Sequence, residues 1–409
     1  MNLMKKRWAL LALACLINLC AGSIYTWSVL APPIAERLSL LTGETVTAGG
    51  IAAAFGLANG IAPIPMILGG AVNDRFGPRL VIAFGGLLIG AGYAAAGLVT
   101  TPLALILGFG LLFGLGLGFV YGPTVNATLK FFPDRPGLAG GLATAFYGLS
   151  SVLLPPVALA LTDAQGVSRA LVTLGGLFAL VIAPGGLLMM KCPEGFIASF
   201  RGPDGVKTPQ RASLDWRGML RSRRFPPMVG MLLAGAIPGM MLLSHGWSLS
   251  RELAGLDAAA ASAVVSALAL ANVAGRLVAG AASDRFGRVA SLSAALAATV
   301  AGCALLFLAS PSAPLAFWCG MTLVGVSFGA FMGIYPGFTA GEFGARHNSV
   351  NYGIMFFGFS AAGFIGPVAM NELLAGGLSP QSVCLAAGAF PLAGLACARL
   401  FCLARASGR

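Results

Sequence analysis

Apolar runs long enough to cross a bilayer recur along the whole chain, and they limit the possible folds more than any other feature. The chain is 57% hydrophobic and only 9% charged, which is too little charge for the surface of a soluble protein of 409 residues. About 20 apolar residues in a helix span a membrane, and the 58 glycines suit helices packed closely in lipid. The sequence therefore predicts an all-α membrane protein with twelve transmembrane helices. The twelve segments are 8–30, 46–71, 80–99, 102–129, 137–161, 169–190, 226–249, 257–282, 289–309, 313–341, 347–374 and 380–404.

The first segment begins with Lys5, Lys6 and Arg7, as a signal peptide does. Its apolar run reaches Pro32, which is too long for the apolar region of a signal peptide, and no clear cleavage site follows. We therefore expect it to be a transmembrane helix. The eight cysteines are scattered without metal-like spacing, so they predict packing residues, no metal site and no cofactor.

The positive charges predict the orientation. If the N-terminus is cytoplasmic and the helices alternate in direction, most Lys and Arg lie in cytoplasmic segments, and only Arg37, Arg169 and Arg251 lie in external loops. This bias predicts a multi-pass protein of the inner (plasma) membrane with both termini in the cytoplasm. The net charge of +12 then reflects topology and contact with anionic lipid, not nucleic-acid binding. We expect a monomer.

The two halves of the chain repeat each other. "GGAVNDRFGPR" (69–79) matches "AGAASDRFGR" (279–288), and "FYGLSS" (146–151) matches "FFGFSA" (356–361). The basic stretch 191–225 separates the halves, so we expect an N-terminal six-helix bundle over 1–190, a cytoplasmic linker and a C-terminal six-helix bundle over 226–409. Repeats of this kind place a binding site between the bundles, near the membrane midplane.

The repeated G-x-x-x-D-R-x-G pattern is similar to the hallmark of the major facilitator superfamily, and the resemblance covers the whole chain. It implies the major facilitator fold, with two pseudo-symmetric bundles. The aspartates can accept hydrogen bonds from the end of a neighbouring helix, and the arginines can pair across the cytoplasmic seam. Such contacts would hold the inner side shut while the outer side is open. The expected gating residues are Asp74, Arg75, Arg79, Asp284, Arg285 and Arg288.

Arg276 lies inside the predicted eighth helix, where an arginine costs about 2.5–3.5 kcal/mol to insert. All 13 Asp and Glu fall in predicted loops or at predicted helix ends, so the anion that pairs with Arg276 must come from outside the protein. Arg276 is therefore predicted to bind an anionic substrate through a guanidinium–carboxylate fork. The alternative is a side chain that reaches toward the cytoplasmic interface.

Other polar residues can be placed beside Arg276. Asn272 precedes it by four residues, on the same helix face, and can hydrogen-bond the guanidinium or the ligand. In the superfamily, helices 1, 4, 7 and 10 line the cavity, which places Tyr25, Tyr121 and Tyr335 as candidate substrate contacts. For each tyrosine, a position at the membrane interface or in the core is an equal alternative.

Within the superfamily the chain resembles the oxalate/formate antiporters and monocarboxylate transporters, through 18–29, 114–123 and 271–288. Oxalate carriers of this group pair the arginine of helix 8 with a lysine on helix 11. Helix 11 here has no Lys or Arg and offers aromatic residues, among them Phe356 and Phe359. One cation and an aromatic wall favour a monocarboxylate such as L-lactate or pyruvate.

The resemblance to monocarboxylate transporters also implies proton symport. The animal carriers have an aspartate where Asn272 stands, and a lysine on helix 1 that this chain lacks. His245 is the titratable candidate in the outer half of the helices, and a structural histidine at the outer interface is an equal alternative. If His245 does not bind the proton, the substrate itself carries it. The alternatives are an oxalate/formate-type anion exchanger and a non-transporting sensor. An enzyme is not expected, because no nucleophile–base pair or metal cluster is visible.

Overall fold

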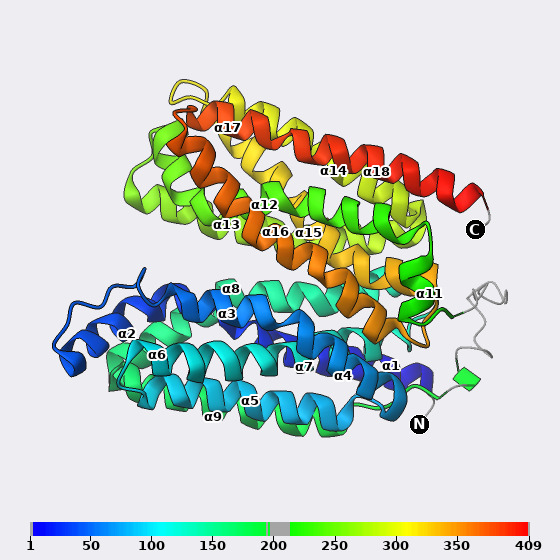
Figure 1. Cartoon of the computed structure of the whole chain (residues 1–409), viewed down its shortest axis with the longest axis horizontal. Coiled ribbons are helices and arrows are strands. Elements are labelled where there is room, and N and C mark those ends of the chain that lie inside the picture. The colour runs from blue at the N-terminus through cyan, green and yellow to red at the C-terminus, as the bar shows by residue number, and fades with distance from the viewer. Residues whose placement is uncertain (1–2, 194, 197–212, 408–409) are drawn as a thin grey trace. The chain divides into compact units, whose positions relative to one another are not determined.

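The computed structural model describes residues 3–193, 195–196 and 213–407, and in this part all regular secondary structure is helical, without a β-strand (Figure 1). Twelve helical segments in this part are long and apolar enough to cross a membrane. The predicted fold class, an all-α protein with twelve membrane spans, is therefore confirmed.

The chain divides into two compact units, neither of which is continuous in sequence. Unit 1 comprises Met1–Asp134, Phe146–Ser213 and Gly344–Ile354, and unit 2 comprises Arg135–Ala145, Leu214–Phe343 and Met355–Arg409. Two helices, α8 (Pro136–Gln165) and α16 (Asn348–Ala375), therefore each contribute to both units. The expected linker over 191–225 lies partly outside the described residues, and its division of the chain into two bundles stays a prediction.

Unit 1 contains most of the helices of the N-terminal half of the chain. Besides parts of α8 and α16 it contains α1 (Leu3–Ala21), the 3₁₀ segment η1 (Gly22–Thr26), α2 (Trp27–Thr42), α3 (Ala52–Ile61), α4 (Pro63–Phe76), α5 (Arg79–Leu98), α6 (Pro102–Leu105), the π segment η2 (Ile106–Phe113), α7 (Gly114–Leu129) and α9 (Val167–Leu188). Helices α5 and α9 lie side by side (Figure 1). Gly90 and Gly175 allow this approach, because a Cβ on either residue would lie within 2.7 Å of the other's carbonyl oxygen.

The first membrane span is longer than the sequence predicted. Helical structure continues from α1 through η1 and α2 to Thr42, past Pro32 and Pro33. Transmembrane helices tolerate such prolines because neighbouring groups satisfy the freed backbone carbonyls. The extension places Glu36 inside a helix, so the expectation that every acidic residue lies in a loop or at a helix end was wrong.

A buried tyrosine organises the core of unit 1. Tyr93 is fully buried, with the rings of Phe109, Phe113 and Phe178 at centroid distances of 5.2–5.6 Å. Its hydroxyl donates to the Ser23 carbonyl at 2.6 Å and lies 2.8 Å from the Thr26 hydroxyl. A buried phenol needs such partners, so this residue ties α5 to η1.

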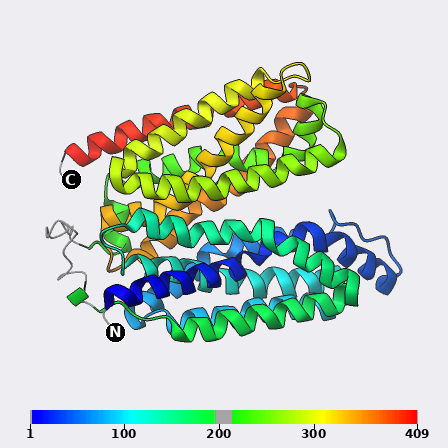
Figure 2. The same ribbon diagram turned by 180° about the vertical axis from the view of Figure 1, so that it is seen from behind.

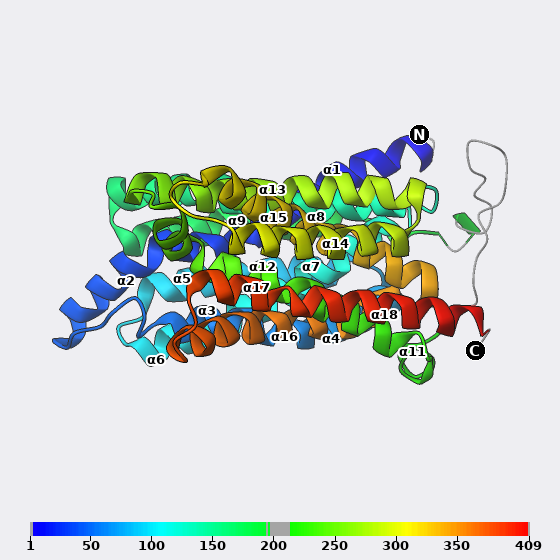
Figure 3. The same ribbon diagram turned by 90° about the horizontal axis from the view of Figure 1, so that it is seen from above.

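Unit 2 contains the remaining helices. Besides parts of α8 and α16 these are α11 (Trp216–Arg221), α12 (Phe225–Ala254), α13 (Ala258–Phe286), α14 (Arg288–Phe307), α15 (Pro314–Phe343), α17 (Pro380–Ala387) and α18 (Ala389–Ala406). Figure 3 shows α17 and α18 as successive pieces of one rod, with α14 packed along it. Residues of α12, α14, α15 and α17 form a continuous apolar core that includes Leu242, Leu306, Phe317 and Phe328.

The N-terminal part of α1 lies at one end of unit 1 (Figure 2), and several basic residues make contacts within this unit. Arg7 forms an ion pair with Asp134 at 2.8 Å. Lys191 donates to the Arg75 carbonyl at 2.8 Å, and Arg79 donates to the Met189 carbonyl at 3.0 Å. A cytoplasmic face requires basic groups at one end of the helices, and the orientation itself stays a prediction.

Candidate functional site

Arg276 is buried in α13, with only 2% of its surface exposed. Its Nε donates to the side-chain oxygen of Asn272 at 2.8 Å, and its Nη1 donates to the Thr144 carbonyl of α8 at 2.7 Å. Asn272 lies one turn earlier on the same helix and is 7% exposed. Two neutral oxygens therefore hold the guanidinium in place.

The charge of Arg276 has no carboxylate partner within 4.0 Å among the described residues. A guanidinium has five N–H donors, and the two recorded bonds leave Nη2 without a protein partner in that part of the chain. Nη2 and the amide nitrogen of Asn272 each keep some accessible surface area. Two available donors thus lie one turn apart on one helix face, beside a positive charge that lacks a counter-ion.

Glycines on two neighbouring helices fix the backbone that carries this pair. A Cβ on Gly329 of α15 would overlap the Asn272 carbonyl oxygen, and one on Gly333 would overlap the Arg276 carbonyl oxygen. On α8, a Cβ on Gly141 would lie 2.5 Å from the Arg276 carbonyl oxygen. The helix backbones can approach this closely only because these positions have no side chain.

We expect Gly329→Ala to destabilise the protein by about 1–3 kcal/mol, because the added methyl group overlaps backbone that cannot rotate away. Gly176→Ala is the matched control, since a Cβ there meets nothing within 4 Å and alanine favours the helix. Thermal unfolding of both variants in the same detergent measures the difference. Equal midpoints for the two variants would mean that α13 and α15 are not in close contact at Asn272.

The two repeated aspartates bind the first turns of α8 and α16. Asp284 of α13 accepts backbone N–H bonds from Gly137 and Leu138 at 2.8 and 2.9 Å. Asp74 of α4 accepts from the Ser349 and Val350 backbone at 3.1 and 3.3 Å. A carboxylate is favourable there because the first N–H groups of a helix lack intrahelical acceptors and carry partial positive charge. The repeated sequence thus makes the same kind of contact in each unit.

Asp74 also has side-chain partners. The Ser349 hydroxyl donates to it at 2.8 Å, and Lys130 forms an ion pair with it at 2.7 Å. The Ser349 hydroxyl oxygen also accepts from the Asn73 amide at 2.8 Å. This end of α4 is therefore held by a network, not by a single cap.

The arginines of the repeated motif have less uniform surroundings. Arg79 donates to the Met189 carbonyl, while Arg75 and Arg285 are exposed, with each guanidinium over the phenylalanine that follows it at 5.0 and 5.5 Å. Arg288 lies so close to Gly341 that a Cβ there would overlap its guanidinium.

The predicted tyrosine contacts separate into two environments. In unit 1, Tyr147 lies between Tyr25 and Tyr121, with centroid distances of 5.7 and 4.9 Å. In unit 2, Tyr335 is fully buried and its hydroxyl donates to the Met228 carbonyl at 2.7 Å. That hydroxyl is already used in the packing of α15 on α12, so we leave Tyr335 out of the proposed substrate contacts.

The phenylalanines of α16 also belong to packing. Phe359 stacks on Phe328 at 5.8 Å and lies 5.0 Å from Phe356. Phe359 is partly buried against the core of unit 2, so it is anchored from one side.

His245 joins two helices through its ring. Its Nδ1 lies 2.8 Å from the Ser244 hydroxyl, and its Nε2 lies 2.8 Å from the side-chain oxygen of Asn371 on α16. The ring is half-buried, whereas Ser244 and Asn371 are exposed.

Sequence reasoning did not find Thr144, Tyr147 or Asn371. Tyr147 stands in the repeated "FYGLSS" motif, which could have marked it. Thr144 takes part through its backbone carbonyl, which no residue-type pattern reveals.

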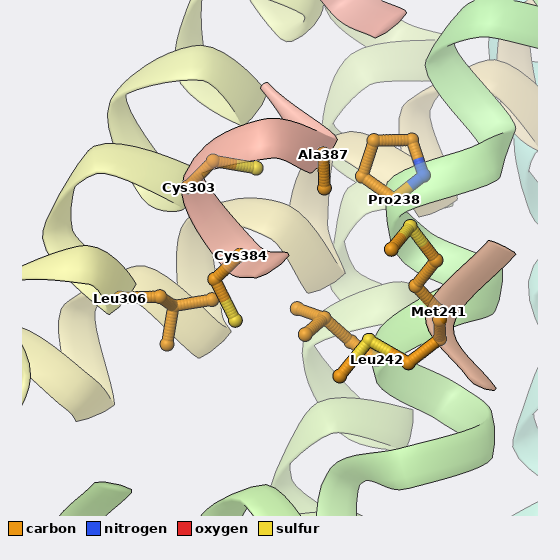
Figure 4. A pocket seen from close by; sticks show the side chains of 8 residues that line it. Pro238, Met241, Leu242, Cys303, Leu306, Cys384 and Ala387 are labelled. Carbon is orange, nitrogen blue, oxygen red and sulfur yellow. The ribbon is translucent and has the colours of Figure 1, made fainter. Parts of the chain in front are cut away.

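A small cavity in unit 2 does not suit an anion. It measures about 10 Å³ and is lined by apolar and sulfur-bearing side chains, including Pro238, Met241, Cys303 and Cys384 (Figure 4). That volume is about one water molecule, and none of these side chains is a strong hydrogen-bond donor. Nor do the described residues gather three His, Cys, Asp or Glu side chains at a possible metal site.

The chain is similar to transport proteins in both sequence and fold. The model of the Major Facilitator Superfamily matches residues 5–367. The oxalate:formate antiporter of Oxalobacter formigenes is 27% identical over 369 residues, covering 89% of this chain and 84% of the antiporter. Human monocarboxylate transporter 11 is 30% identical over 285 residues, covering 68% of this chain and 56% of that protein. The crystal structure of the human organic anion transporter MFSD10 superposes with a TM-score of 0.72 at 14% identity, over 97% of this chain and 100% of that one.

Proposed function

The chain belongs to the Major Facilitator Superfamily of secondary transporters, and we propose that it carries a small monocarboxylate, such as L-lactate or pyruvate, with a proton by alternating access. The observation that carries this proposal is the buried guanidinium of Arg276, which has no carboxylate partner in the described chain. A buried cation without a counter-ion is costly, so an anion that enters the site is bound strongly.

We assign the carboxylate group of the substrate to two hydrogen-bond donors of α13, one on Arg276 and one on Asn272. One oxygen would accept from Nη2 of Arg276 and the other from the amide nitrogen of Asn272. The Asn272 oxygen and the Thr144 carbonyl keep the guanidinium oriented, so binding needs little rearrangement at the arginine. As the sequence predicts, Phe356 and Phe359 are proposed as apolar contacts of the substrate, and Tyr25 and Tyr121 as further aromatic candidates.

The names of the relatives support an organic anion as substrate and leave two classes open. One relative is named for oxalate and formate and another for monocarboxylates. Helix α16 contains no Lys or Arg between Asn348 and Ala375, which favours a single negative charge. Oxalate carries two, and the second would need a cation of its own.

We therefore expect oxalate to inhibit lactate uptake only at a concentration at least about 30-fold above that of pyruvate, because an unpaired carboxylate in a closed site costs several kcal/mol. Competition in proteoliposomes at constant pH and ionic strength measures this ratio, with formate as a second anion of single charge. Inhibition by oxalate at or below the pyruvate concentration would favour an oxalate/formate-type exchanger.

The contacts of Asp74 and Asp284 are proposed to act in gating. Each carboxylate holds the first turn of a helix that contributes to both units, so releasing it would free that helix end to move. Arg75, Arg79, Arg285 and Arg288 are proposed to support these contacts. We also propose that the protein is a monomer of the inner membrane with both termini cytoplasmic, and that 1–190 and 226–409 act as its two bundles.

Counterflow tests the proposed function directly. Purified protein in vesicles preloaded with L-lactate should accumulate labelled external lactate transiently, without any ion gradient. A channel or a sensor cannot do this, since only a carrier exchanges one molecule for another. If preloading with lactate, pyruvate, formate or oxalate produces no counterflow, the assignment to small carboxylates is wrong.

A further inference from the structure

Three hydrogen-bonded side chains link the C-terminal part of α12 to the C-terminal part of α16. The link runs from the Ser244 hydroxyl through the ring of His245 to the side-chain oxygen of Asn371, with both steps at 2.8 Å. Every link is a hydrogen bond to a ring nitrogen, so the protonation of the ring and the arrangement of these bonds depend on each other.

Asn371 fixes which ring nitrogen carries the hydrogen. An amide oxygen can only accept, so the Nε2 that faces it must donate. A neutral imidazole has one donor and one acceptor, which leaves the lone pair on Nδ1. In the neutral form of His245, Nδ1 is therefore the ring nitrogen that can take a proton.

Ser244 accommodates both states of Nδ1. Its hydroxyl oxygen lies 2.8 Å from Nδ1, 2.9 Å from the Met241 carbonyl and 3.0 Å from the Met240 carbonyl. With the ring neutral, the single hydroxyl hydrogen points to Nδ1. With the ring protonated, Nδ1 donates to the serine oxygen and the hydroxyl hydrogen turns to a backbone carbonyl. The proton is accepted by rotation of one hydroxyl group, without movement of any heavier atom.

The nearest charged residues along the two helices are Arg251 and Glu252 on α12 and Glu372 on α16. Arg251 lies over the Trp247 ring at 5.1 Å. Within residues 3–193, 195–196 and 213–407, no charged side chain of any helix packed on α12 forms a hydrogen bond or ion pair with His245. Both hydrogen-bond partners of the ring in this part of the chain, Ser244 and Asn371, are thus neutral.

We infer that Nδ1 of His245 is the atom that accepts the transported proton, with Asn371 as the residue that sets the tautomer and Ser244 as the residue that accepts from the protonated ring. This inference rests on the proposed proton symport. Besides His245, it gives Asn371 and Ser244 a function in positioning the ring and its hydrogens.

The tautomer can be measured directly in the full-length protein. The chain has two histidines, so His347→Gln leaves His245 as the single source of imidazole signals. With ¹⁵N-labelled histidine in reconstituted vesicles, we expect Nε2 protonated and Nδ1 unprotonated at high pH, and both protonated at low pH. Asn371→Leu should abolish the preference for Nε2, whereas Ser244→Ala should retain it. A neutral ring protonated on Nδ1, or a preference that survives Asn371→Leu, would overturn the inference.

Transport by a further variant separates this inference from the proposed function. Asn371→Asp places a carboxylate against Nε2, which favours the charged ring. We expect the pH range of proton-driven lactate accumulation to move upward by about one unit or more. An unchanged pH profile with intact accumulation would overturn the inference about His245 and leave symport standing. If the His347→Gln protein accumulates no lactate under a pH gradient although the tautomer is as expected, proton symport is what fails.

Discussion

Replacing Arg276 with lysine is expected to reduce lactate uptake at least about 30-fold while the protein still folds. Lysine keeps the charge but loses the planar fork, and its single nitrogen cannot contact Asn272, the Thr144 carbonyl and a carboxylate in the same geometry. Each hydrogen bond to a charged group contributes about 1.5–3 kcal/mol. The loss of one such bond to the substrate therefore accounts for a 30-fold effect, at about 1.4 kcal/mol for each factor of ten.

Initial rates of labelled lactate uptake in proteoliposomes measure this effect. Arg399→Lys is the matched control, because Arg399 is exposed on α18 and makes no recorded contact with the site. Equal elution profiles and unfolding midpoints for both variants would show that folding is intact. Uptake by Arg276→Lys within about threefold of the parent protein would remove Arg276 from the site.

The apolar pattern of the sequence was enough to predict the fold class and the number of membrane spans. Twelve runs of hydrophobic residues predicted twelve spans, because a bilayer sets the required length. The first span was predicted to end at residue 30, but the helical structure continues past Pro32 and Pro33 to Thr42, because neighbouring groups in a membrane protein can satisfy the backbone that proline leaves free. The end of α2 at Thr42 is set by Gly43, whose left-handed backbone at φ 74° closes the helix.

The candidate site was only partly visible in the sequence. The four-residue spacing places Asn272 against Arg276, because helix geometry alone brings such residues together. The Thr144 carbonyl and Asn371 could not be found in that way, because their contacts depend on how α8 packs on α13 and α16 on α12. For Tyr335 the sequence predicted a substrate contact that the structure does not favour. Its place in the repeat resembles that of Tyr121, but its hydroxyl donates to the Met228 carbonyl.

Replacing His245 with alanine is expected to abolish lactate accumulation driven by a pH gradient and to preserve exchange of lactate for lactate. A lactate anion and one proton carry no net charge together, so their symport is electroneutral and follows the pH gradient alone. Without a titratable ring at this position, a proton no longer binds in step with the substrate. Exchange needs no change in protonation across the cycle, so it depends on Arg276 and Asn272 and should continue.

Two assays on the same vesicles measure these activities, one with an imposed pH gradient and one with unlabelled lactate inside at equal pH. His347→Ala is the control, because His347 stands between α15 and α16, in the loop before Asn348, and has no predicted part in proton binding. We expect the control to retain both activities and His245→Ala to retain only exchange. Loss of both activities in a folded His245→Ala protein would assign the residue to substrate binding. Retention of both would favour entry of lactate as the neutral acid, because a proton bound to the carboxylate itself needs no protein site.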